Sequence, residues 1–166
     1  MQKMKKIRLY VRIKAIYKVG GILLVPDLGF YVQKINQLVQ DTEAVGEKMH
    51  PKYMIVREAI DGNKVSDLSA EVLADIIQTF ESGTKEYEQM LNKLNGLRPP
   101  ARILGLHKRL HAAYRNYVTG CQAMIASLQA ETIDVAAFNA AEKQQDEATD
   151  TIGSAIQRMT MLLLKR

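Results

Sequence analysis

Apolar residues recur at alternating steps of four and three from Ile103 to about Ala130. This spacing places them on one face of an amphipathic helix, and the charges Lys108, Arg109 and Arg115 lie off that face. We therefore predict one long helix here, buried against several others. Its main stripe consists of Leu104, His107, His111, Tyr114, Val118, Cys121, Ile125 and Leu128.

Three other segments show the same period. The first starts at Pro26-Asp27, with Asp27 as N-cap, and should end at His50-Pro51, because the residue before a proline disfavours the α conformation. The second is capped by Ser69 and stops at Asn95-Gly96. The last is capped by Asp134 and runs towards the C-terminus. Their stripes are Leu28, Tyr31, Ile35, Leu38, Thr42, Val45 and Met49; Leu73, Ile76, Phe80, Gly83, Tyr87, Met90 and Leu94; and Phe138, Ala141, Gln145, Ala148, Ile152, Ala155, Met159 and Leu162.

The connections between these helices predict the topology. Residues 52–68 are long enough for a short extra helix, over 52–60, that crosses an end of the bundle or covers a groove. The other two connections are short, which requires antiparallel neighbours. The sequence thus predicts an all-α fold, an antiparallel up-down-up-down four-helix bundle over residues 27–166, preceded by an arm over residues 1–26.

We single out five glycines inside the predicted helices, each of which costs about 1 kcal/mol relative to alanine. Close approach of neighbouring helices would offset this cost, and we favour that interpretation. The alternative is a groove that admits a partner helix or a ligand. The five are Gly46, Gly83, Gly105, Gly120 and Gly153.

The arm has a different pattern. Apolar and basic or aromatic residues alternate strictly over residues 7–14, and Gly20-Gly21 precedes a second apolar run, which together predict a β-hairpin. A degenerate targeting segment is one alternative, although Pro26 closes the apolar run early and no Ala-x-Ala cleavage site follows. A solvated basic edge is another.

Charge separates the arm from the body. Residues 1–18 contain seven of the 23 basic residues and none of the 18 acidic ones, a formal charge of +7. The other 16 basic and 18 acidic residues give the rest of the chain −2. Nucleic acid is therefore an unlikely partner for the body, since phosphate binding needs clustered cations. Residues 1–18 could instead meet an anionic membrane surface or a cell-envelope polymer.

His107 and His111 are the only weak candidates for a metal site, because side chains at i and i+4 share a helix face. Counting layers from an antiparallel hairpin, in which Leu94 faces Leu104, places Tyr31, Tyr87, Met90 and Met159 around them, and none of these is a carboxylate. We therefore predict no metal and no cofactor. We expect the imidazoles to bond to the hydroxyl of Tyr31 or Tyr87 or to loop carbonyls.

No catalytic arrangement emerges from the sequence. Cys121 is fourteen residues from His107, about 20 Å along one helix, so the two cannot form a dyad within the chain. We interpret this lone cysteine as a small core residue, and nothing about it requires an oxidising compartment. A non-catalytic protein in the cytoplasm is favoured, with export or surface association as alternatives.

One end of the predicted bundle is unusually apolar. Leu162, Leu163 and Leu164 point in three directions at 100° intervals, so they cannot all face one core. Together with Ile7, Leu9, Val11 and Ile13 of the arm, they form the predicted interaction surface. The leading hypothesis is an interaction module that acts by protein–protein contact or self-association. The alternatives are a membrane-surface binder and a small-ligand or metal-binding bundle at the histidine layer.

Overall fold

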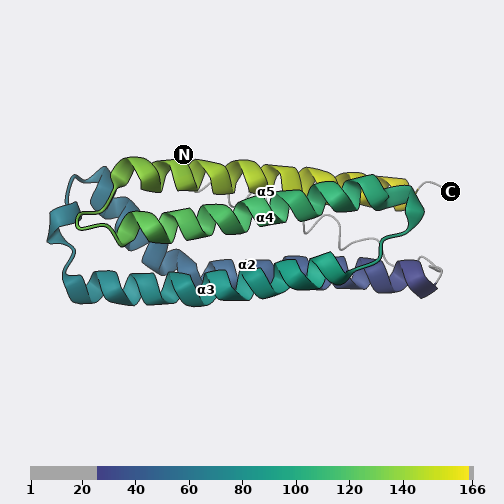
Figure 1. The fold of residues 1–166 in the computed structure, drawn as a ribbon, viewed down its shortest axis with the longest axis horizontal. Coiled ribbons are helices and arrows are strands. Elements are labelled where there is room, and N and C mark those ends of the chain that lie inside the picture. Colours follow the sequence, from purple (N-terminus) through teal and green to yellow (C-terminus); the bar gives the residue numbers. More distant parts are fainter. Residues whose placement is uncertain (1–25, 165–166) are drawn as a thin grey trace.

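The computed structural model describes residues 26–164, which form four long α-helices and two short 3-10 helices (Figure 1). This confirms the prediction of an all-α body in which four long helices pack against one another, and no strand occurs in the described part. The elements in order are α2 (Pro26–Asp61), η2 (Val65–Asp67), α3 (Ala70–Gly96), η3 (Ala101–Ile103), α4 (Leu104–Leu128) and α5 (Val135–Leu164).

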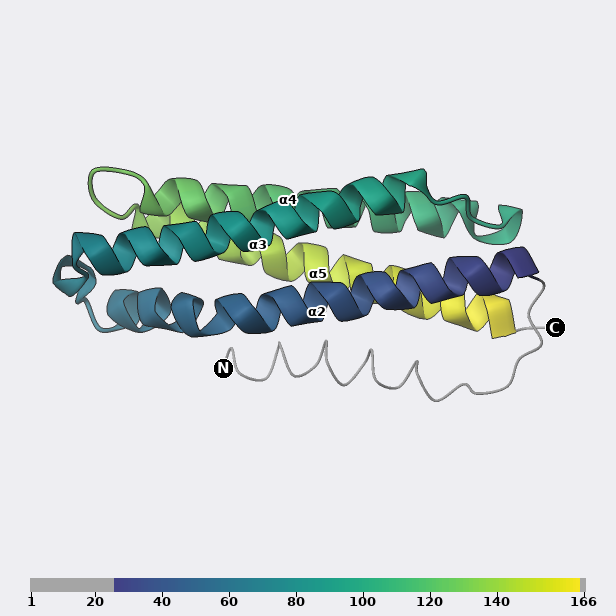
Figure 2. The same ribbon diagram turned by 90° about the horizontal axis from the view of Figure 1, so that it is seen from below.

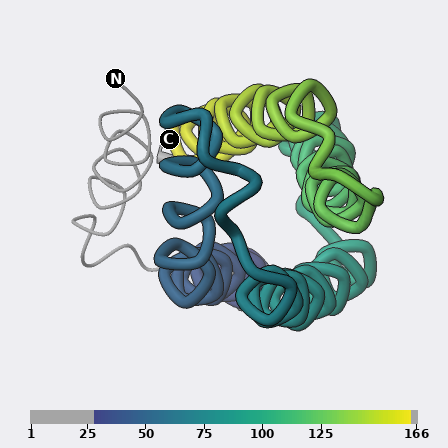
Figure 3. The backbone as a smooth tube through the Cα atoms, turned by 90° about the vertical axis from the view of Figure 1, so that its left-hand side faces the viewer, coloured from purple at the N-terminus to yellow at the C-terminus, as the bar shows by residue number. Residues whose placement is uncertain are grey.

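The long helices lie lengthwise beside one another, and Figure 3 shows them arranged around a common core. Close backbone packing joins α2 to α3, α3 to α4, and α4 to α5. The colours in Figure 1 show that α4 begins and α5 ends at the end of the molecule where α2 begins. The connection from α2 to α3 lies at the opposite end, with the one from α4 to α5.

Local signals set both ends of α3 and the start of α5 as the sequence predicts, whereas Asp27, the predicted N-cap of the first helix, lies inside α2, which begins at Pro26. The Ser69 hydroxyl accepts a hydrogen bond from the backbone N–H of Val72 at 3.2 Å, so it caps α3. The Asp134 carboxylate accepts one from the N–H of Ala137 at 2.9 Å, before α5. α3 ends at Gly96, and the extended residues that follow separate it from η3.

The predicted end of the first helix is wrong. α2 continues through Pro51 to Asp61, so residues 52–60 are not a separate short helix, and the only helical segment between α2 and α3 is the three-residue η2. A proline inside a helix costs about 3 kcal/mol. Contacts with α5 offset this cost: the ring of Tyr53 stacks on Phe138, and Arg57 donates a hydrogen bond to Asn139 at 2.7 Å. Figure 3 shows the last turns of α2 approaching α5.

The core divides into two clusters along the bundle. The first core cluster lies towards the end where α2 begins and includes the buried tyrosines Tyr31, Tyr87 and Tyr114. The second core cluster lies towards the opposite end and comprises Val56, Ile76, Phe80, Met124, Ile125, Leu128, Phe138 and Ala141. Most stripe residues are buried as predicted, but Leu104 and Leu162 are exposed.

Two helical glycines allow the close helix approach that the sequence predicts. A Cβ atom on Gly83 would overlap the sulfur of Met49, and one on Gly120 would lie 2.9 Å from Cγ of Gln145. The same prediction is wrong for Gly105, which has no atom within 4 Å of its Cβ position. Close packing therefore explains Gly83, at the α2–α3 contact, and Gly120, at the α4–α5 contact.

Candidate functional site

His107 is buried on α4 and bonded to Tyr31 of α2. Their Nδ1 and Oη atoms are 2.9 Å apart, and the Tyr31 hydroxyl also lies 3.7 Å from the sulfur of Met159 on α5. Burial, and second the neighbouring His111, lower the pKa of His107, so the imidazole is neutral at pH 7. This layer thus ties three helices together through neutral groups.

His111 lies one turn further along α4 and is half-buried. Within the described residues, no three His, Cys, Asp or Glu side chains gather closely enough to hold a metal ion. The structure brings Tyr31 and Met159 to His107, as the layer count indicates, but it places Tyr87 and Met90 in the next layer along the bundle. That part of the predicted neighbourhood is wrong.

The next layer is a hydroxyl network that sequence analysis missed. The Thr42 hydroxyl donates to the carbonyl oxygen of Leu38 at 2.7 Å and lies 2.8 Å from Tyr114 Oη. Tyr87 donates to the Thr42 carbonyl oxygen at 3.3 Å, and Tyr117 donates to the Tyr87 hydroxyl at 3.4 Å. Burial raises the pKa of all three tyrosines, which keeps the phenols protonated.

This network is complete without a ligand. In the part of the chain that the structure describes, every buried side-chain nitrogen or oxygen has a hydrogen-bond partner. Cys121 is buried in the same first core cluster, as predicted for a small core residue. A satisfied network of protonated phenols stabilises a fixed packing arrangement.

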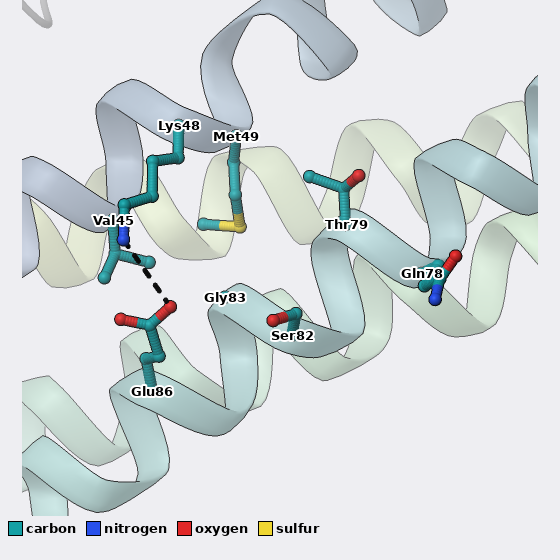
Figure 4. A pocket seen from close by; sticks show the side chains of 8 residues that line it. All are labelled: Val45, Lys48, Met49, Gln78, Thr79, Ser82, Gly83 and Glu86. Atoms are coloured by element: carbon teal, nitrogen blue, oxygen red, sulfur yellow. Dashed lines mark ion pairs between the residues drawn. The ribbon is translucent and has the colours of Figure 1, made fainter.

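A groove lies between α2 and α3 (Figure 4). Met49 lies against Gly83 in this groove, and Lys48 Nζ and Glu86 Oε1 form an ion pair across it at 3.9 Å. The volume is about 310 Å³, at the low end for a small-ligand pocket. The groove continues along the same two helices to Lys93, with a further volume of about 230 Å³. The helical glycines were the sequence signal for such a groove.

The predicted interaction surface is only partly described. Leu162 is exposed, and so are Met161 and Leu104, at 38%, 54% and 44% respectively. Leu163 instead packs against the first core cluster. The side chain of Leu164 and the arm residues Ile7, Leu9, Val11 and Ile13 lie outside the described residues.

The beginning of α4 and the end of α5 are linked through η3. The guanidinium of Arg102 donates a hydrogen bond to the carbonyl oxygen of Leu162 at 2.8 Å, which holds the start of α4 against the end of α5. Leu104 therefore shares one end of the molecule with Met161 and Leu162 (Figure 1). Sequence patterning predicted Leu162 for this surface but placed Leu104 in the core.

Comparisons with protein-family models, curated proteins and solved structures give no match to this chain. No helix among residues 26–164 has the length and apolar character needed to cross a bilayer.

Proposed function

We propose that this chain is a non-catalytic interaction module and that it acts by self-association through one apolar end. The proposed architecture is an antiparallel up-down-up-down four-helix bundle over residues 27–166. In that topology the beginning of α4 and the end of α5 share one end. The contact surface consists of Leu104, Met161 and Leu162, which we call the apolar end.

The observation that carries this proposal is the exposure of these three side chains at one end of the molecule. Single exposed apolar residues are common on protein surfaces, whereas a cluster of them is typical of an association site. Leu104 is 44% exposed on α4, and Met161 is 54% exposed on α5. Arg102 links the two elements through its hydrogen bond to Leu162. A second copy can cover such a surface with an identical one.

Light scattering of the full chain tests the proposal. We expect a mass above that of one chain at micromolar concentration, and a single-chain mass for the double variant Met161→Ser/Leu162→Ser. Leu163 is left unchanged because it packs in the core, and its substitution would confound association with folding. The matched control is Ile55→Ser/Val72→Ser, which removes two exposed apolar residues from the opposite half of the molecule.

Three results would contradict the proposal. A single-chain mass for the wild type at every concentration would exclude self-association. An unchanged mass in the folded Met161→Ser/Leu162→Ser variant would show that the contact lies on another surface. Equal loss of mass in both double variants would indicate a general effect of surface polarity.

The second candidate function is binding to an anionic membrane surface through residues 1–18. The seven basic residues of this segment, with no acidic residue among them, favour it. Sedimentation with phosphatidylglycerol vesicles tests it. Binding that falls as salt rises would support it, and the absence of binding at low salt would exclude it.

A further inference from the structure

The side of α2 that faces α5 differs in charge from the side that faces α3. Tyr53 and Arg57 mark the first side, because they contact Phe138 and Glu142 of α5. Residues three, four and seven positions away along each helix continue the same side. The α2–α5 face defined in this way comprises Val32, Asn36, Glu43, Glu47 and His50 of α2 with Asp146, Asp150 and Gly153 of α5.

Close backbone packing does not extend across this face. Among the long helices it joins only consecutive pairs, and α2 meets α5 through side chains. Most of those contacts come from the last turns of α2, where Tyr53 reaches Glu142. Towards the beginning of α2, Val32, Asn36 and Glu43 are half-buried. On this part of α2 (Figure 2), half-buried polar and acidic residues therefore lie next to the buried Val39.

The charges on α2 are segregated about its axis. Lys48 pairs with Glu86 of α3, and Lys52 pairs with Asp75 of the same helix. The cation nearest the other side, Arg57, forms ion pairs with Asp61 and Glu142. By helical position, the α2–α5 face carries the acidic groups Glu43, Glu47, Asp146 and Asp150. Lys143, at the edge of this face on α5, is paired with Glu147.

The N-terminal segment has the complementary composition. Residues 1–18 hold seven cations and no acid, with apolar residues between them. The segment joins α2 at Pro26, at one end of the face. Twenty-five residues span about 37 Å as a helix and about 80 Å when extended, so either conformation covers the roughly 27 Å from residue 32 to residue 50.

We propose that residues 1–18 dock on the α2–α5 face of their own chain, with their lysines and arginines paired to Glu43, Glu47, Asp146 and Asp150. Covalent linkage at Pro26 favours the chain's own segment, since it is held at an effective concentration in the millimolar range. Docking places apolar arm residues over Val32 and neutralises the acidic edges. This proposal is independent of the apolar end, which lies on α4 and α5.

Zero-length carbodiimide cross-linking of the full chain tests the docking, because it joins only amines and carboxylates already in contact. An equal mixture of unlabelled and nitrogen-15-labelled protein separates contacts within a chain from contacts between chains. We expect cross-links within one chain from Lys3, Lys5, Lys6, Lys14 or Lys18 to the four acids of the face. Raised salt should reduce their yield, as screening weakens such pairs.

A charge-neutralised variant gives a second readout. In Glu43→Gln/Asp146→Asn/Asp150→Asn, trypsin should cut within residues 1–18 about tenfold faster, since three ion pairs are lost. The matched control, Glu58→Gln/Glu71→Gln/Glu131→Gln, removes the same charge from exposed positions elsewhere and should leave the rate unchanged. Circular dichroism confirms that each variant is folded before digestion.

Several outcomes would overturn the proposal. Cross-links of mixed isotopic composition would assign the arm to a second copy. If no cross-links to the face form and the full chain sediments with phosphatidylglycerol vesicles, residues 1–18 bind a membrane instead. Absence of both, or equal acceleration of cleavage in the control variant, would remove charge-directed docking altogether.

Discussion

The two core clusters hold the same four helices together by different means. In the first, Tyr31, Thr42 and Tyr114 make hydrogen bonds between helices, and the hydroxyls must meet within about 3 Å. In the second, the buried side chains, such as Val56 and Phe138, are all apolar, and hydrogen bonds such as that of Tyr53 to Glu142 come from partly buried side chains at its edge. Apolar contact is non-directional, so it tolerates small shifts that a hydrogen-bonded layer does not.

The two clusters therefore have different roles: one mainly supplies stability, and the other also fixes the register of the helices against one another. The second core cluster supplies free energy through burial, at about 25 cal/mol per Å² of apolar area. The first also buries large rings, but its network additionally fixes which turn of one helix faces which turn of another. A buried hydroxyl that loses its partner costs about 1–3 kcal/mol, and that penalty disfavours slipped arrangements.

The largest expected effect comes from the second core cluster. Phe138→Ala should lower the free energy of unfolding by about 3–5 kcal/mol, because Phe138 is fully buried and its removal leaves a cavity. Urea unfolding followed by circular dichroism measures the change. Phe30→Ala, at an exposed position on α2, serves as the control and should change it by less than about 0.5 kcal/mol. Similar losses in the two variants would contradict this picture of the core.

A smaller effect is expected in the first core cluster. Tyr114→Phe keeps the ring but removes the hydroxyl that bonds to Thr42, so it should cost about 1–2 kcal/mol. A double-mutant cycle with Thr42→Val should show coupling of about 0.5–1.5 kcal/mol between the two positions. Strict additivity would mean that this hydrogen bond does not specify register.

Substitutions at two glycines of α4 should change the free energy of unfolding by about 1 kcal/mol, in opposite directions. Gly120 lies where the clusters meet, and a methyl group there would press on Gln145. Gly120→Ala should therefore destabilise the protein, although alanine has a higher helix propensity than glycine. Gly105→Ala meets open space and should stabilise by about 0.5–1 kcal/mol. Thermal melts of the two variants should shift in opposite directions, and shifts of the same sign would contradict the packing at Gly120.

The smallest effect concerns pH. Because the pKa of His107 is lower in the folded protein than in the unfolded chain, the unfolded state binds its proton first as the pH falls below about 6.5. The free energy of unfolding should therefore decrease as pH falls from about 7.5 to about 5.5. His107→Gln should remove most of this slope, whereas His111→Gln should retain it in weaker form. Equal slopes in the wild type and His107→Gln would exclude His107 as its source.

Local sequence signals predicted most of the helical architecture, and tertiary contacts explain the exception. Ser69 and Gly96 bound α3 as expected, because capping depends on neighbouring residues only. Pro51 did not end α2, because Tyr53 and Arg57 gain contacts with α5 that lie about ninety positions away in sequence. No rule based on the residue before a proline includes such contacts.

The candidate site was predicted only in part, because its neighbours depend on how the helices are connected. Tyr31 meets His107 because both lie near helix ends that share one end of the bundle. Tyr87 does not, because the connection over residues 97–103, with its 3-10 helix η3, pairs α3 and α4 differently from the simple count that sets Leu94 against Leu104. This changes the register, and Met90 contacts Tyr114 instead. Connection geometry of this kind is not encoded in the hydrophobic period.

The continuation of α2 past Pro51 affects the order in which the chain matures during synthesis. Its last turns pack on Phe138 and Glu142 of α5, which leave the ribosome long after Pro51. Until α5 appears, the cost of the proline is offset by contacts with α3 alone, such as that of Lys52 with Asp75, so the nascent α2 is weakest there. Translation must therefore pass Glu142 before the part of α2 that follows Pro51 adopts its mature form.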